Sequence, residues 1–95
     1  MNDEEKLLRE ELKEEAKVWI REEYARRFEK VRETLEKQAM ETIEHMKSQG
    51  MKGEDEVAAE TQMSVNYARS ELLKEVEFEA FNWIEEEVKK RLKGD

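Results

Sequence analysis

The second half of the chain carries apolar residues at helical spacing on two opposite faces. We name the first face the seam stripe, which consists of Val57, Thr61, Val65, Ala68, Leu72, Val76 and Trp83. The second face, the outer stripe, consists of Ala59, Met63, Tyr67, Phe78, Phe81, Ile84, Val88 and Leu92. A surface helix of a globular protein needs only one apolar stripe. Two opposed stripes therefore predict one long helix with two packing partners.

The first half of the chain shows a second helical pattern, whose apolar face changes along its length. From residue 24 onward the stripe is regular and consists of Tyr24, Phe28, Val31, Leu35, Ala39, Thr42 and Met46. Before it, Leu8, Leu12, Ala16 and Trp19 fall on a face rotated by roughly half a turn. Because this segment lacks glycine and proline, a sharp kink has no obvious cause. We expect the N-terminal half to pack on a different neighbour; a kink near residues 19–24 is the alternative.

Backbone punctuation is confined to the centre and the C-terminal end of the chain. There is no proline, and the glycines are Gly50, Gly53 and Gly94. Gly50 follows Ser48-Gln49 as a left-handed helix cap, and Asp55 is a good N-cap for the next helix. The pattern predicts a helix over residues 3–48, a loop over 49–54 and a helix over 55–93, in a single domain that spans residues 1–95.

A short loop between two long helices imposes an antiparallel hairpin. Its centre brings together residues whose numbers add up to about 102. Trp19 then lies opposite Trp83. Thr42 faces Thr61, and Leu12 meets Val88, on the same count. The predicted fold is therefore all-α, with two long antiparallel helices.

Neither the outer stripe nor the rotated N-terminal face has a partner within a straight hairpin. Buried aromatic residues dominate the energetics of interfaces, and leaving them in water is unfavourable. We therefore expect a homodimer or higher homo-oligomer in which two hairpins form a four-helix bundle. The expected interface residues are Leu8, Leu12, Trp19, Tyr67, Phe78, Phe81, Ile84 and Val88.

Composition narrows the class of protein further. Charged residues make up 46% and apolar residues 37% of the chain, a mixture typical of long helices and coiled coils. Since cysteine is absent, disulfides and cysteine-based zinc sites are excluded. The missing cysteine and proline and the charged helix surfaces are also typical of designed and hyperthermophilic proteins. A polar start without an apolar signal segment favours a cytoplasmic protein, and no apolar run is long enough to cross a membrane.

The chain is acidic, with a formal net charge of −8. Between Glu54 and Glu87, eleven acidic residues stand against two basic ones, Arg69 and Lys74. Such a surface repels phosphate backbones, so nucleic-acid binding is disfavoured. The same surface favours an alternative function, that of an acidic inhibitor or nucleic-acid mimic that binds a basic protein.

The chain offers one weak candidate for metal binding. Glu41 and His45 are four residues apart in the first helix, and Glu56 and Glu60 are four apart in the second. The hairpin would bring both pairs to its loop end, where a bundle could hold a divalent metal. Acidic pairs at this spacing are common by chance in so acidic a chain, so we expect an exposed histidine, and a metal-binding bundle is the second alternative.

Catalytic chemistry finds no support in the sequence. The chain lacks Ser/His/Asp and Cys/His sets, a glycine-rich phosphate loop and zinc-ligand spacing. Glu79 falls in the seam stripe, where a lone carboxylate is costly unless paired, so we expect an ion pair with Arg26 or Arg27. The first prediction is a non-enzymatic module for oligomerisation or protein binding, without a cofactor.

Overall fold

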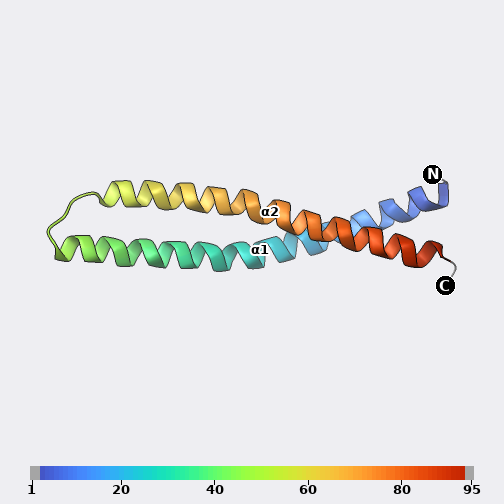
Figure 1. Cartoon of the computed structure of the whole chain (residues 1–95), viewed down its shortest axis with the longest axis horizontal. Coiled ribbons are helices and arrows are strands. Elements are labelled where there is room, and N and C mark those ends of the chain that lie inside the picture. Colours follow the sequence, from blue (N-terminus) through green and yellow to red (C-terminus); the bar gives the residue numbers. More distant parts are fainter. Residues whose placement is uncertain (1–2, 94–95) are drawn as a thin grey trace. The chain divides into compact units, whose positions relative to one another are not determined.

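The protein is an antiparallel helical hairpin, as the apolar pattern predicts. A computed structural model describes residues 3–93 and contains helix α1, Asp3–Ser48, and helix α2, Glu54–Leu92, which pack against each other (Figure 1). The observed ends of α2 differ by one residue from the expected 55–93, which lies within the usual uncertainty of helix termini. Neither helix, within the described part of the chain, is long and apolar enough to cross a membrane.

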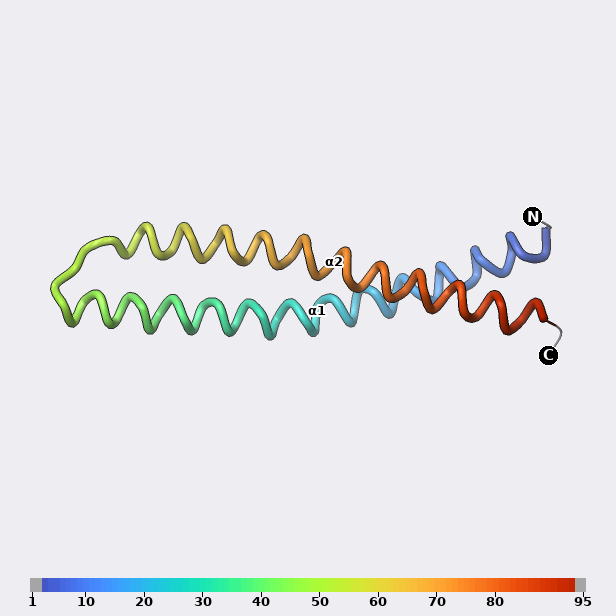
Figure 2. The backbone as a smooth tube through the Cα atoms, viewed as in Figure 1, coloured from blue at the N-terminus to red at the C-terminus, as the bar shows by residue number. Residues whose placement is uncertain are grey.

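Gly50 ends α1 in the left-handed conformation that the sequence predicts. Its φ angle is 68°, and its N–H donates to the carbonyl of Lys47 at 3.1 Å. The N–H of Met51 donates to the carbonyl of Met46 at 2.8 Å. Together these two hydrogen bonds form a Schellman motif, which satisfies carbonyl groups that the last turn of a helix leaves without partners. The chain then turns back towards α2 (Figure 2).

The start of α2 differs from the prediction. The carbonyl of Gly53 accepts the N–H of Val57 at 3.1 Å, so Gly53 occupies the N-cap position and Asp55 lies inside the first turn. Asp55 still favours the helix start, because carboxylates interact well with the positive end of the helix dipole. Gly53 has a φ angle of 130°, and a Cβ atom there would approach Cε of Met46 to 3.0 Å. No other residue fits this position without strain.

The contacts of the hairpin divide it into two units, each built from part of both helices. We name Met1–Ala25 with Leu73–Asp95 the terminal unit, and Arg26–Leu72 the loop unit. That the two units make up a single domain over residues 1–95 stays a prediction. The ends of that range, residues 1–2 and 94–95, lie outside the described residues.

The terminal unit contains the best-formed core. Its buried cluster consists of Leu12, Ala16, Ala80, Ile84 and Val88, with Leu8 and Ile20 packed against it. Val76 is also fully buried. The predicted proximity of Leu12 and Val88 is therefore confirmed.

This core follows a spacing of four residues in both helices. The core positions are Leu8, Leu12, Ala16 and Ile20 in α1, and Val76, Ala80, Ile84 and Val88 in α2. Four residues turn an α-helix by about 400°, so each step moves the buried face about 40° further around the helix. A repeat longer than 3.6 residues makes helices wrap in the right-handed sense. Three steps carry the buried face through about a third of a turn.

The shift of the buried face around both helices shows that two of the expectations from the sequence are wrong. Ile84 and Val88 belong to the outer stripe, yet they are buried inside the hairpin's own core, so the inference that this part of the stripe lacks an internal partner is wrong. The rotated face of α1 at Leu8 and Leu12 packs on α2, not on a different neighbour. The helix α1 is unbroken through residues 19–24. The apolar face shifts around both helices in step, so the two faces stay in contact and neither helix has to break.

The loop unit has a thinner core. Val65 is the one buried apolar residue among its described positions. The half-buried residues around it include Val31, Leu35, Ala39, Val57, Ala68 and Leu72 of the predicted stripes. Ile43 is half-buried in place of the predicted Thr42, which is exposed. Thr42 and Thr61 line the same shallow groove, as the predicted register requires. The guanidinium of Arg69 lies 5.2 Å from the centre of the Phe28 ring, a cation–π contact.

Candidate interaction site

Large apolar side chains remain exposed along both helices. Within residues 3–93 they are Leu7, Val18, Trp19, Met40, Met51, Met63, Tyr67, Leu73, Phe78, Phe81, Trp83 and Leu92. Single exposed apolar residues are normal on protein surfaces, whereas grouped aromatic residues mark binding sites. The grouped aromatic residues of this protein are two phenylalanines and two tryptophans, all in the terminal unit.

The structure divides the expected interface residues into two sets. Leu12, Ile84 and Val88 are buried in the terminal unit, and Leu8 is half-buried against the same core. The exposed set consists of Trp19, Tyr67, Phe78 and Phe81. A partner that binds the hairpin as it stands has access to residues of the exposed set and not to the buried set.

Phe78 and Phe81 form the most exposed aromatic surface of the terminal unit. Their exposed fractions are 64% and 56%. Residues three apart in a helix are surface neighbours, so the two rings make one continuous apolar surface, which we name the phenylalanine surface. Exposure of a phenylalanine ring to water is unfavourable. Burial of this surface against another apolar surface would therefore be favourable.

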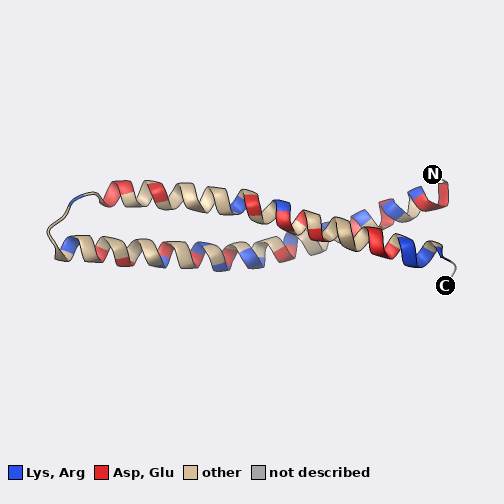
Figure 3. Ribbon diagram, viewed as in Figure 1, with Lys and Arg blue, Asp and Glu red and all other residues tan. Residues whose placement is uncertain are grey.

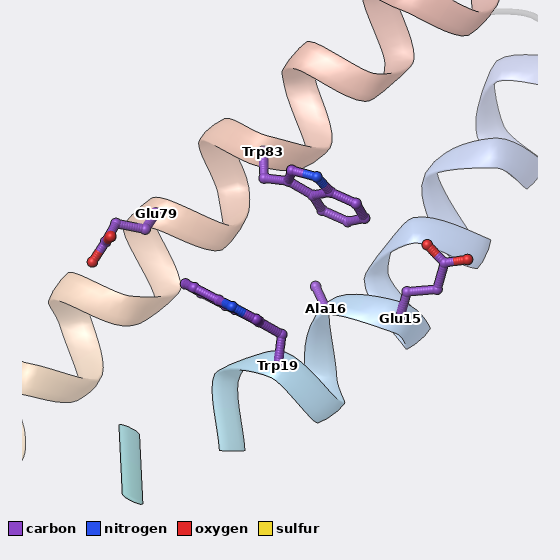
Figure 4. A pocket seen from close by; sticks show the side chains of 5 residues that line it. All are labelled: Glu15, Ala16, Trp19, Glu79 and Trp83. Atoms are coloured by element: carbon purple, nitrogen blue, oxygen red, sulfur yellow. The ribbon is translucent and has the colours of Figure 1, made fainter. Parts of the chain in front are cut away.

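The two tryptophans line a cleft between the helices of the terminal unit. Trp19 and Ala16 come from α1 and Trp83 from α2, and Glu15 and Glu79 complete a lining around a cavity of about 490 Å³ (Figure 4). The indoles are 41% and 40% exposed. In Figure 4 the two indoles lie across the opening from each other, and the two carboxylates lie at opposite ends of the pair. The predicted juxtaposition of Trp19 and Trp83 is confirmed, and we name this feature the tryptophan cleft.

A sequence repeat builds this cleft. Residues 15–23 read EAKVWIREE and residues 79–87 read EAFNWIEEE, so each segment places Glu, Ala, Trp and Ile at the same spacing. The similarity extends over residues 8–28 and 72–92, in which nine of the 21 aligned positions are identical. This internal repeat is the sequence signal for the site, and the apolar stripes do not reveal it.

The structure uses equivalent residues of the two repeat copies in the same way. Ala16 and Ala80 are both buried in the core, and Trp19 and Trp83 both line the cleft. Because the copies run antiparallel, such equivalence means that an approximate two-fold axis relates them. The small alanine side chains let the helices approach, and the bulky indoles lie one position away from the core, beside it.

An ion pair links the helices within the terminal unit and breaks this symmetry. The guanidinium of Arg9 donates hydrogen bonds to both carboxylate oxygens of Glu85, one of them at 3.2 Å, and to Glu5 at 3.2 Å. Two-pronged contacts of this kind are the stronger class of ion pair. They lower the pKa of the Glu85 carboxyl below its ordinary value, chiefly through the hydrogen bond from Arg9. They also raise the pKa of Arg9.

The residues proposed for a metal are all exposed in the loop unit. They are Glu41 and His45 on α1 and Glu56 and Glu60 on α2. Within residues 3–93 the structure assembles no group of three His, Cys, Asp or Glu side chains that could hold a metal ion. The four residues are therefore not brought together as a site.

Glu79 lies at the edge of the core, not in it. The buried face moves from Val76 to Ala80, so Glu79 is half-buried and lines the tryptophan cleft. No charged side chain is fully buried in the described part of the chain, so the expected cost of a buried carboxylate does not arise there. An ion pair of Glu79 with Arg26 or Arg27 stays a prediction.

Comparison of the chain with protein-family models, curated proteins and solved structures finds no match.

Proposed function

We propose that this chain is a non-enzymatic helical interaction module whose primary partner is a second copy of itself. The observation that carries the proposal is the phenylalanine surface, where two aromatic rings are 64% and 56% exposed. The core beneath it consists of alanine, valine, leucine and isoleucine side chains. The terminal unit thus exposes its largest aromatic rings and buries smaller groups, the reverse of what a self-sufficient small domain does.

A second hairpin is the occupant that fits this surface best. Two helices packed side by side present a ridged face that a second helical pair covers, as in four-helix bundles. Stable interfaces of standard size bury about 1,600 Å² in total. A hairpin with helices of 46 and 39 residues offers ample length for contacts of that size, and the phenylalanine surface supplies the apolar centre.

Sedimentation analysis over a range of protein concentrations tests this proposal. We expect a dimer or higher oligomer at micromolar concentration that dissociates on dilution. The double substitution Phe78→Glu with Phe81→Glu should give a folded monomer, because two carboxylates replace the apolar centre. The matched control is Met40→Glu with Met51→Glu, which places the same charges on exposed apolar residues of the loop unit that are not among the expected interface residues. A wild-type chain that is monomeric at all concentrations and melts cooperatively would contradict the proposal.

The acidic surface supports a second candidate function. Acidic residues recur along α2, with basic residues gathered at its C-terminal end (Figure 3). Between Glu54 and Glu87, eight of the eleven carboxylates are exposed. Such a surface would bind a basic protein in place of nucleic acid. Binding to a basic partner that weakens steeply with added salt supports this function, whereas salt-insensitive binding counts against it.

A further inference from the structure

We propose that the tryptophan cleft binds an organic cation of the quaternary ammonium class. The cleft lies apart from the phenylalanine surface. Trp83 is two residues after Phe81 in α2, which places it about 200° away around the helix. The proposed site therefore stays open when a second copy covers the phenylalanine surface, and this inference goes beyond the proposed function.

The indoles supply the first part of the argument. An indole presents a negative face to a cation, and tryptophan is the strongest aromatic partner in cation–π contacts. Trp19 and Trp83 come from opposite helices and remain about 40% exposed, with space between them (Figure 4). Equivalent positions in the internal repeat make the two walls alike. A cation between them meets an aromatic surface on both sides.

The charge of the lining supplies the second part. Glu15 and Glu79 line the cleft, and no lysine or arginine does among the described residues. The charged side chains at the opening are thus both carboxylates, which favour a cation over an anion there. Glu15 precedes Trp19 by four residues and Glu79 precedes Trp83 by four, so each indole has a carboxylate on its own helix face.

Size and solvation decide which cation fits. A cavity of about 490 Å³ lies within the usual range of about 300–1,000 Å³ for small-molecule sites. A metal ion or simple ammonium keeps a tight hydration shell, which an apolar indole wall cannot replace. A quaternary ammonium carries its charge beneath methyl groups, so it displaces water from the indoles and still interacts with the negative faces.

Tryptophan fluorescence gives a direct test, because Trp19 and Trp83 are the only tryptophans of the chain and both line the cleft. Full-length protein is titrated with choline at constant ionic strength, with sodium chloride as the balancing salt. The parallel titration uses 3,3-dimethylbutan-1-ol, an uncharged molecule of the same shape. We expect a saturable change with choline and at least about ten-fold weaker binding of the alcohol, since the alcohol lacks the charge that the indoles and carboxylates attract. A second titration with free trimethyllysine separates a preference for the ammonium group from a preference for choline as a molecule.

Variants locate the binding site. Glu15→Gln should weaken choline binding by about three-fold, the effect of one nearby exposed charge, whereas Glu14→Gln removes the same charge from the neighbouring residue outside the cleft and should leave it unchanged. Trp19→Phe keeps an aromatic ring there and Trp83 as the reporter, and should weaken binding by about five-fold. Circular dichroism confirms that each variant is folded.

Three outcomes overturn the proposal. They are an equal response to choline and the alcohol, equal losses for Glu14→Gln and Glu15→Gln, and no saturable change up to about 100 mM choline, the limit for a weak exposed cation–π site. Sedimentation in the presence of choline, performed in parallel, keeps a failure of this site distinct from a failure of self-association.

Discussion

At the scale of single residues, the Arg9–Glu85 ion pair is the clearest electrostatic link between the helices of the terminal unit. Both side chains are partly shielded from water, with about a quarter to a third of their surface exposed. An exposed pair of this kind would contribute little. The two-pronged geometry and the second carboxylate at Glu5 make this one a contact whose removal should be measurable.

The Arg9–Glu85 ion pair makes the free energy of unfolding depend on pH. Arg9 lowers the pKa of Glu85 below its ordinary value of 4.5, so the folded state favours the ionised carboxylate. The stabilisation is therefore fully present above pH 4.5 and is lost as the pH falls through the lowered pKa. Glu85→Gln should lower the melting temperature at pH 7 and reduce its loss on acidification to pH 3. Glu86→Gln, an exposed neighbour, is the control, and equal effects of both substitutions would contradict a specific role for Glu85.

Substitution of Ile84 tests whether this residue lies in the core of its own chain or at an interface with a partner. It is buried against Leu12 and Ala16 in the same chain, so Ile84→Ala should cost about 2–5 kcal/mol of unfolding free energy through lost apolar contact and a residual cavity. Because the contact lies within one chain, that cost should appear equally in the monomeric Phe78→Glu with Phe81→Glu background. Urea denaturation of both proteins measures it. A cost that vanishes in the monomeric background would place Ile84 at the partner interface.

At the scale of helices, the sequence was sufficient for the hairpin but not for the path of its core. The glycine at position 50 and the absence of proline define the two helices almost to the residue. In the terminal unit, however, the predicted seam includes Trp83, because its side chain is large and apolar, and it omits Ala80. Alanine carries little hydrophobic signal, yet Ala16 and Ala80 lie in the core because their size lets the helices approach. Periodicity locates an apolar face, while close packing selects which residues of that face are buried.

The tryptophan cleft shows a second limit of the sequence pattern. The register predicts that Trp19 meets Trp83, and they do share a cavity. The pattern assigns Trp83 to the seam and Trp19 to the rotated face, because a helical projection cannot distinguish a residue in the core from one beside it. Comparison of the chain with itself would have served better, since residues 15–23 and 79–87 match at the positions that build both the core and the cleft.

The approximate two-fold axis predicts a second ion pair that the sequence lacks. In the internal repeat, Arg21 is equivalent to Glu85 and Leu73 is equivalent to Arg9. Leu73→Glu should therefore place a carboxylate opposite Arg21, at the positions that the two-fold axis relates to the existing pair but with the two charges exchanged. A double-mutant cycle with Arg21→Ala should show a favourable coupling of about 0.2–1 kcal/mol, the range for partly exposed pairs. Leu73→Gln is the control for the loss of the leucine, and absence of coupling would show that the two sides are not equivalent.

At the scale of the whole molecule, apolar attraction and charge repulsion oppose each other. The phenylalanine surface favours association, whereas a net charge of −8 on each copy disfavours it through the summed field of both chains. The balance of these effects distinguishes self-association from binding of a basic partner, because salt acts on the two in opposite directions.

Salt should strengthen self-association. Raising the ionic strength from about 0.02 M to about 0.3 M shortens the screening length from roughly 20 Å to below 10 Å, which weakens repulsion between two acidic chains but leaves the apolar contact intact. We expect the dissociation constant of the dimer to fall several-fold over this range, as measured by sedimentation equilibrium. An acidic mimic bound to a basic protein would instead lose affinity over the same range, because its attraction is the interaction that salt screens. A dimer that dissociates as salt is added would mean that opposite charges on the two copies hold it together, and the phenylalanine surface would then lie outside the interface.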